Sequence, residues 1–297
     1  MKLAVVAHAG KTLGGGLSEL RRALEDAGVP APLWIEVPKS KRAPLAVERA
    51  LEDGAELIFA WGGDGMVQRC VDALRGAQVP LAVVPAGTSN LFATNLGIEP
   101  DIAQAVQVAL LGDRRRLDVG CFNGERFAVM AGAGFDAAMI KGSDNLKDRF
   151  GRAAYVIGGA ARLRAESFET TIKIDGTRWY KGPASCILLG NVGDLFGGIE
   201  VFTDAKPDDG LLDVGVLTSE GAVQTVRAVA RTAFGSAQKS PFVRVTKARS
   251  VRVKLDRKVP YELDGGDRTK VKSFKVDVEP GAITLCVPPG AARGGER

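Results

Sequence analysis

The chain has little histidine, and this excludes several kinds of chemistry. Only one histidine, His8, occurs among the 297 residues. Zinc hydrolases that need several imidazole ligands are therefore excluded, and a Ser-His-Asp triad is disfavoured. If the chain carries a general base, we expect it to be a carboxylate.

Cysteines are few and widely spaced, and long apolar runs are absent. The four cysteines form no Cys-x-x-Cys pair, so we expect reduced, buried thiols in place of disulfides or a zinc site. No segment approaches the roughly 18–20 apolar residues of a membrane helix. The apolar part of the first ten residues is too short for a secretory signal. We therefore expect a cytoplasmic protein whose contact with a membrane is peripheral.

Hydrophobic residues make up 45% of the chain, which predicts a globular protein. Its length suffices for two domains. The formal net charge of +5 favours anionic partners such as nucleotides, acidic lipid surfaces or nucleic acids. Aromatic residues are only 6% of the chain and do not interleave with the basic residues, so nucleic acid is not expected as a partner.

Residues 1–117 alternate between strand and helix signals. Apolar runs predict strands at 3–7, 33–37, 57–60 and 79–84. Amphipathic stretches between and after them predict helices at about 17–27, 43–53, 66–74 and 102–111. This alternation predicts an α/β domain with a parallel sheet, whose ligands bind beyond the carboxyl ends of the strands.

Residues 118–288 have a different texture and predict a β-rich, antiparallel second domain. Short alternating segments at 126–130, 170–175, 185–189, 212–217, 243–245, 251–255, 270–278 and 283–287 are separated by turn signals such as Asp175-Gly176 and Pro280-Gly281. Two helices are expected at about 146–164 and 221–234. The Gly/Arg-rich residues 289–297 are expected to form a flexible tail.

Two small-residue loops follow neighbouring predicted strands. Gly62-Gly63-Asp64-Gly65 comes directly after one strand, and Pro85-Ala86-Gly87-Thr88-Ser89-Asn90 follows the next. Glycines after a strand let backbone N–H groups face phosphate, and a helix N-terminus adds positive potential. Asp64 would then hold Mg²⁺, which bridges to phosphate oxygens. The alternative is that both loops are ordinary turns. Asp64 would then cap a helix at the first loop, and Thr88 or Ser89 would cap the helix that follows the second loop.

Three further motifs lie in the second half of the chain. These are Gly190-Asn191-Val192-Gly193 followed by glycines at 197–198, the acidic turn at 207–213, and the carboxylate-rich turn at 261–267. The acidic turn suits a hard cation held by a carboxylate and backbone carbonyls. Asp-Gly hairpin turns are common, however, and a plain turn is the alternative.

In this order, the motifs resemble the diacylglycerol kinase catalytic-domain family. The chain looks like the soluble bacterial lipid kinase branch, which is also similar to sphingosine and ceramide kinases. The resemblance covers nearly the whole chain. It implies two domains, with ATP bound in the cleft between them, and transfer of the γ-phosphate to the hydroxyl of a membrane lipid, diacylglycerol by default.

The resemblance also implies roles for individual residues. The ATP loop matches Gly62, Gly63, Asp64, Gly65, Met66, Val67, Gln68 and Arg69, and the second phosphate contact matches Thr88. A structural Mg²⁺ site matches the Asp209 carboxylate with the carbonyls of Lys206 and Leu211. The turn at Asp264 matches the family's Asp-Gly-Glu segment, in which the catalytic base lies.

The chain departs from the family pattern after the GGDG loop and in the turn that follows Asp264. The family usually has Thr directly after GGDG and then Asn-Glu, where this chain has Met66, Gln68 and Arg69. The glutamate of the Asp-Gly-Glu segment is replaced by Gly266. We therefore assign the base to Asp264, with Asp267 as the alternative.

Residues 251–255 alternate apolar and basic side chains, so one face of the predicted strand is cationic. It is either an ordinary solvated sheet face or a surface that docks on an anionic bilayer, where each basic residue is worth about 1 kcal/mol. An edge strand of this domain could support a homodimer.

Two functional alternatives remain open from the sequence. An NAD kinase shares a GGDG loop and a related architecture, although the loop at 85–90 and the turn at 263–266 fit the lipid kinases better. A catalytically degenerate nucleotide- or lipid-binding relative is suggested by Met66, Arg69 and Gly266. The sequence does not name the lipid.

Overall fold

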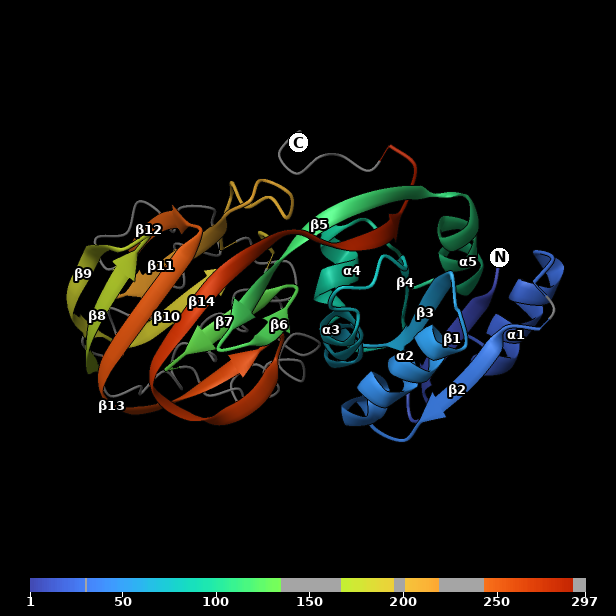
Figure 1. Cartoon of the computed structure of the whole chain (residues 1–297), viewed down its shortest axis with the longest axis horizontal. Coiled ribbons are helices and arrows are strands. Elements are labelled where there is room, and N and C mark those ends of the chain that lie inside the picture. The colour runs from blue at the N-terminus through green and yellow to red at the C-terminus, as the bar shows by residue number, and fades with distance from the viewer. Residues whose placement is uncertain (30, 135–166, 195–200, 219–242, 291–297) are drawn as a thin grey trace, which may run out of the picture. The chain divides into compact units, whose positions relative to one another are not determined.

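The computed structural model describes residues 1–29, 31–134, 167–194, 201–218 and 243–290, which fold into two compact units (Figure 1). Unit 1 consists of Met1–Val119 with Pro280–Arg297, and unit 2 consists of Gly120–Glu279. Both boundaries fall within strands, β5 (Asp113–Phe122) and β14 (Gly266–Val287). The second domain is predicted at 118–288, whereas the chain returns to unit 1 at Pro280.

Unit 1 is built on parallel strands, as the sequence predicts. They are β1 (Leu3–His8), β2 (Leu33–Val37), β3 (Leu57–Gly62) and β4 (Leu81–Pro85). Their order in the sheet is β4-β3-β1-β2, and the end of β14 lies beside β4. All the residues of β3 and β4 are buried, which explains why these strands are continuous apolar runs.

Helices connect these strands. They are α1 (Leu17–Asp26), α2 (Ala43–Glu52) after the short 3₁₀ helix η1 (Ser40–Arg42), α3 (Asp64–Ala73), α4 (Leu91–Asn95) and α5 (Ile102–Leu111). Asp101 caps α5, because its side chain accepts the N–H of Gln104 at 2.7 Å. The helix predicted at 66–74 begins at Asp64, and α4 was not predicted.

Unit 2 is β-rich and antiparallel, which confirms the predicted fold class. Its further strands are β6 (Glu125–Phe127), β7 (Met130–Ala133), β8 (Phe168–Ile174), β9 (Thr177–Ala184), β10 (Cys186–Gly190), β11 (Leu212–Leu217), β12 (Val243–Ala248) and β13 (Ser250–Leu263). The long strand β13 pairs with β8 through residues 251–255 and with β7 through residues 261–263.

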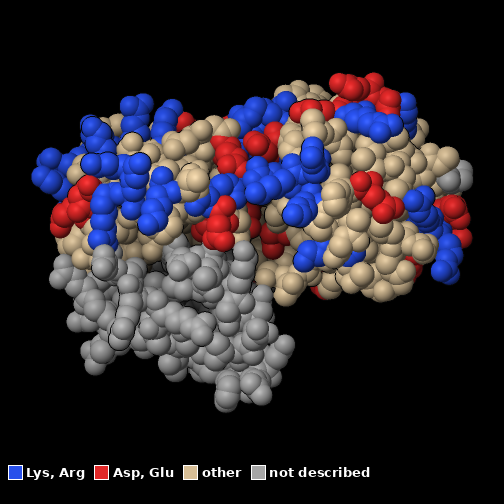
Figure 2. All heavy atoms as spheres, turned by 90° about the horizontal axis from the view of Figure 1, so that it is seen from below, with Lys and Arg blue, Asp and Glu red and all other residues tan. Residues whose placement is uncertain are grey.

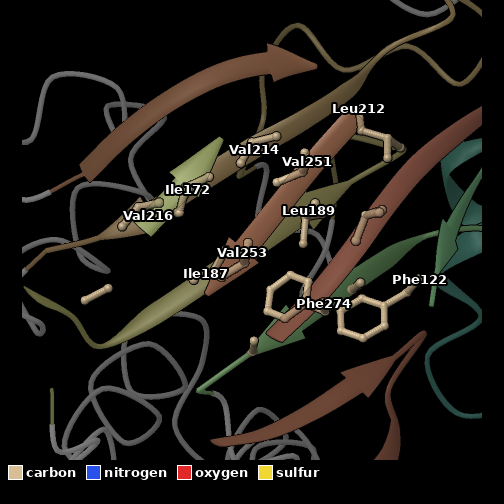
Figure 3. Packing of buried hydrophobic residues seen from close by; sticks show 14 of the residues in the cluster. Phe122, Ile172, Ile187, Leu189, Leu212, Val214, Val216, Val251, Val253 and Phe274 are labelled. Carbon is tan, nitrogen blue, oxygen red and sulfur yellow. The ribbon is translucent and has the colours of Figure 1, made fainter. Parts of the chain in front are cut away.

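The core of unit 2 forms because every second side chain of its strands points inward (Figure 3). Val251 and Val253 are buried, whereas Arg252 and Lys254, which alternate with them along the strand, are exposed. The Phe122 ring stacks on Phe274 with ring centroids 4.6 Å apart. Burial of these apolar side chains is the main stabilising contribution to the unit.

Two strand predictions were wrong, for identifiable reasons. The strand predicted at 126–130 is interrupted between β6 and β7, because the N–H groups of Ala128 and Val129 bind a carboxylate. The turn predicted at Pro280-Gly281 is instead part of the continuous strand β14. There, Gly281 is held by Arg116, which donates to its carbonyl, and by Asp118, which accepts its N–H.

The helices predicted at 146–164 and 221–234 lie outside the described residues, as do the glycines at 197–198 and the tail from residue 291. Within the described part of the chain, no helix combines the length and apolar character that spanning a membrane requires.

Candidate active site

The two glycine loops of unit 1 meet at the carboxyl ends of β3 and β4. Gly62, which ends β3, lies opposite Pro85, which ends β4. Beyond them the backbones of Gly63 and Gly87 are in contact. A Cβ atom at Gly87 would lie 2.4 Å from the Gly63 Cα atom, so only glycine fits at this position.

Asn90 fixes the shape of the second loop. Its Oδ1 accepts the N–H of Gly87 at 2.8 Å, and its Nδ2 donates to the carbonyls of Pro85 at 3.1 Å and Gly87 at 3.0 Å. Its φ of 49° is left-handed, a conformation that asparagine tolerates better than most residues. No role of its own is predicted for Asn90 from the sequence, although asparagine is a frequent turn residue.

Asp64 connects the first loop to α4. It is the first residue of α3, and its Oδ1 accepts the N–H of Phe92 at 3.1 Å. Burial raises the pKa of Asp64, and hydrogen bonds from backbone N–H groups at the start of α4 oppose this rise. The carboxylate therefore binds the N-terminus of α4, and not that of α3, the helix that Asp64 itself begins, while its role with Mg²⁺ stays a prediction.

The other predicted nucleotide residues differ in exposure. Gly65 and Thr88 are exposed, and Arg69 is half-buried. The side chains of Met66, Val67 and Gln68 are at most 3% exposed. We therefore expect these three residues to shape α3 and its N-terminal backbone, and not to touch a ligand with their side chains.

In unit 2, the carboxylate of Asp264 is anchored by backbone donors. It accepts the N–H groups of Ala128 at 2.7 Å, Val129 at 2.8 Å and Met130 at 2.8 Å. The residue is 6% exposed and has a left-handed φ of 48°. Hydrogen bonds from several N–H groups stabilise an ionised carboxylate and fix its position.

Glu262 lies two residues away and is fully buried. Its Oε2 accepts the N–H of Gly265 at 2.8 Å, whereas its Oε1 has no hydrogen-bond partner among the described residues. Oε1 lies over Gly132 of the neighbouring strand, 3.2 Å from where a Cβ atom there would be. Burial, together with the charge of Asp264, raises the pKa of Glu262 to about 8. Its carboxyl group is therefore mostly protonated at neutral pH.

Glu262 is not among the site residues predicted from the sequence. A signal was present, because Glu262 stands between Tyr261 and Leu263 in a strand whose alternate side chains are apolar and buried. An acidic side chain at such a position lies on the strand face away from the apolar side chains. That face is covered either by solvent or by a second packed layer. The pattern alone does not distinguish these cases.

Asp267 and Gly266 occupy the start of β14. Asp267 is exposed and pairs across the hairpin with Glu262. The Arg268 guanidinium donates to the Gly266 carbonyl at 2.9 Å and to the Glu125 carboxylate. A Cβ atom at Gly266 would lie 2.8 Å from Arg268 Nη1, so Arg268 fills the space beside this glycine.

The predicted metal residues lie in the acidic loop that precedes β11. Asp209 Oδ1 accepts the N–H of Leu211 at 3.0 Å, and the side chain of Lys206 is exposed. Asp209 Oδ2 is 2.8 Å from the ammonium of Lys247. Among the described residues, no group of three or more His, Cys, Asp or Glu side chains is arranged to hold a metal ion.

The cationic strand face is present. Arg252 of β13 lies opposite Lys173 of β8 on one side and Lys275 of β14 on the other, and all three side chains are exposed. Figure 2 shows Lys and Arg gathered over unit 2, on the left of that view. The row carries three positive charges directly across three strands.

Two family models match the chain. The model described as diacylglycerol kinase catalytic domain matches residues 2–122, and that described as YegS C-terminal NAD kinase beta sandwich-like domain matches residues 129–287. A Pseudomonas aeruginosa protein named "Probable lipid kinase YegS-like" is 32% identical over 251 residues, which are 82% of this chain and 81% of that protein. A Bacillus subtilis protein named "Diacylglycerol kinase" is 28% identical over 84% of this chain and 83% of its own length.

Solved structures agree on the fold. A crystal structure of a diacylglycerol kinase from Bacillus anthracis has a TM-score of 0.76 at 21% identity and covers 98% of both chains. An NAD kinase from Archaeoglobus fulgidus, solved in complex with ATP, has a TM-score of 0.53 at 11% identity, with 96% of this chain and 93% of that chain covered. At these identities the likeness concerns the fold alone.

Proposed function

Because the chain belongs to the YegS-like family of lipid kinases with a diacylglycerol kinase catalytic domain, we propose that it transfers the γ-phosphate of ATP–Mg²⁺ to a lipid hydroxyl. The acceptor class is a diacylglycerol-like lipid. The observation that carries the nucleotide half of this proposal is the contact between Gly63 and Gly87, which joins two small-residue loops at the ends of neighbouring parallel strands.

Unit 1 would bind the polyphosphate through backbone groups. The predicted residues are Gly62, Gly63, Asp64, Gly65, Met66, Val67, Gln68, Arg69 and Thr88. Small residues allow phosphate to approach the main chain closely, and the N-terminus of α3 favours negative charge. The exposed hydroxyl of Thr88 is free of the helix-capping role that the sequence left open, since Asn90 organises its loop and stands at the N-cap of α4.

The reaction is a phosphoryl transfer. The lipid oxygen forms a bond to the γ-phosphorus, the bond between that phosphorus and the β–γ bridging oxygen breaks, and ADP leaves. The hydroxyl proton passes to a carboxylate. Positioning and charge neutralisation supply most of the catalysis in such reactions.

We assign the proton acceptor to the carboxylate cluster at 262–267. Asp264 remains the proposed base, with Asp267 as the alternative. Since Asp264 is held by three backbone donors, its replacement also disturbs the structure. Glu262 is not a candidate base, because its carboxyl group is fully buried and mostly protonated at neutral pH.

The lipid would reach the protein from a membrane surface. The exposed row of Lys173, Arg252 and Lys275 supports docking on anionic lipid, where each basic residue contributes about 1 kcal/mol. This contact, the cytoplasmic location, a role in phospholipid biosynthesis and a homodimer through an edge strand all belong to the proposal.

The experiment is transfer of labelled γ-phosphate from ATP–Mg²⁺ to a panel of lipids in mixed micelles, with NAD as a soluble acceptor alongside. We expect one lipid class to be labelled and NAD to stay unlabelled. Labelled NAD would instead identify an NAD kinase.

Variants assign the base in the same assay. Loss of the base lowers kcat by roughly 10²–10⁴. We expect that loss in Asp264→Asn, with a smaller loss in Asp267→Asn, and thermal unfolding of each variant separates a chemical defect from a folding defect. ATP–Mg²⁺ binding with no labelled acceptor would mean that the chain has kept the fold and lost the reaction, as the replacement by Gly266 suggests.

A further inference from the structure

The acidic loop before β11 is bound by the side chain of Lys247. The Lys247 ammonium contacts the carboxylate of Asp209, at which a divalent cation is predicted. Lys247 Nζ donates to the Asp204 carbonyl at 2.7 Å and to Asp209 Oδ2 at 2.8 Å. Asp213 Oδ2 lies 3.6 Å from the same nitrogen. One backbone carbonyl and two carboxylates therefore surround a single ammonium group.

These oxygens are of the kind that a hard cation uses. Mg²⁺ and Ca²⁺ bind carboxylates and backbone carbonyls. The Lys247 ammonium offers three N–H donors and one positive charge to such oxygens. Both oxygens of Asp209, the predicted carboxylate ligand, already have protein partners: Oδ1 accepts the N–H of Leu211, and Oδ2 accepts from the Lys247 ammonium. The residues present thus fit an ammonium ion and not a metal ion.

The fold places Lys247 there. Strands β11 and β12 are antiparallel, and their register sets Lys247 directly opposite Asp213. Lys247 therefore lies near the end of the strand pair that adjoins the loop, where the loop supplies the Asp204 carbonyl and the Asp209 carboxylate. Its side chain is 29% exposed and that of Asp213 is 7% exposed, so the pair is partly shielded from water. Burial lowers the pKa of Lys247, but its hydrogen bond to Asp209 and the neighbouring carboxylates outweigh this and raise it.

We propose that Lys247 is a built-in replacement for the structural divalent cation, so that the loop 204–213 is ordered without bound metal. The proposal concerns the structure of unit 2 and does not depend on the acceptor lipid. It also separates two uses of Mg²⁺: the ion that accompanies ATP as substrate is still required, whereas a metal ion bound to the protein loop is not.

The test compares thermal unfolding of the wild type, Lys247→Ala and Lys206→Ala in chelator and in millimolar Ca²⁺ or Mg²⁺ at constant ionic strength. Lys206→Ala is the matched control, because it removes an exposed lysine of the same loop and keeps its carbonyl. The wild type and the control should unfold at the same temperature in chelator and in cation. Lys247→Ala should unfold several degrees lower in chelator and recover at least half of this loss in cation.

Luminescence of Tb³⁺, a probe for Ca²⁺ sites, gives a second readout. Lys247→Ala should bind Tb³⁺ at the vacated oxygens, and Lys247→Ala with Asp209→Asn should not. If Lys247→Ala does not fold, Lys247→Gln serves in both assays. The proposal is overturned if the wild type itself is stabilised by the cations, or if the lysine variants lose no stability or show no response to cation.

Discussion

The two glycine loops of unit 1 and the carboxylates of unit 2 are held in place by different kinds of contact. In unit 1, the backbones of Gly63 and Gly87 touch, and one nearby side chain, Asn90, closes the second loop. In unit 2, carboxylates take their partners from distant parts of the chain, as Asp264 does from residues 128–130 and Asp209 does from Lys247. Unit 1 thus has small-residue loops that we propose approach phosphate closely, whereas unit 2 has fixed carboxylates to which we assign the hydroxyl proton.

The largest effect should come from Asp264→Asn. The substitution replaces one oxygen, which accepts backbone N–H groups, with an NH₂ group that faces a donor. Hydrogen bonds to a charged acceptor are worth about 1.5–3 kcal/mol each, so we expect a loss of about 2–4 kcal/mol. Chemical denaturation measures this loss. Asp267→Asn, at an exposed position, is the control and should change stability by no more than about 0.5 kcal/mol. Equal stability of both variants would show that the backbone donors do not depend on the Asp264 carboxylate.

Glu262→Gln should change how stability depends on pH. The pKa of Glu262 is raised in the folded state from 4.5 to about 8, so the folded protein binds the extra proton between these values. The wild type should therefore lose stability as the pH rises through this window and level off above it. Each unit of pKa difference corresponds to about 1.4 kcal/mol, so Glu262→Gln should be more stable than the wild type by about 2–4 kcal/mol at high pH.

Unfolding curves across this pH range check the prediction. The two proteins should be nearly equally stable in acid, where Glu262 is protonated and resembles glutamine in shape. Parallel pH profiles would mean that Glu262 is ionised in the folded protein throughout the window.

Gly87→Ala tests the backbone contact of unit 1. The added methyl group would lie 2.4 Å from the Gly63 Cα atom, so the two loops must separate. Overpacking costs about 1–3 kcal/mol, and we expect ATP affinity to fall by about tenfold or more. Gly10→Ala is the control, because the nearest atom to its Cβ is a His8 ring carbon at 3.4 Å. Unchanged ATP affinity in Gly87→Ala would separate this contact from nucleotide binding.

The smallest effect should come from the cationic row. Arg252→Gln removes one charge from an exposed position between Lys173 and Lys275. A basic residue at an anionic surface is worth about 1 kcal/mol, which predicts about fivefold weaker binding to vesicles that contain anionic lipid. Sedimentation with vesicles measures this. Asp256→Asn removes a negative charge from the same strand and should strengthen binding to these vesicles. If both variants bind the vesicles as the wild type does, the row is an ordinary solvated face.

The contrast between the units also explains what the sequence could predict. The strands and loops of the first unit are local patterns, so β2 and α5 were predicted with their observed bounds and the glycine loops were recognised. Interactions between distant residues were missed. Nothing near Asp264 indicates that the N–H groups of residues 128–130 surround it, and nothing near Asp209 indicates Lys247, because only the pairing of strands brings them together.

Equilibrium titration of ATP–Mg²⁺ into the wild type, Gly87→Ala and Glu262→Gln tests the division between the two units most directly. The account predicts that Gly87→Ala loses affinity for the nucleotide, whereas Glu262→Gln binds it as tightly as the wild type. Equal loss of affinity in both variants, with both folded, would contradict the assignment of nucleotide binding to the glycine loops and of the acceptor chemistry to the carboxylate cluster.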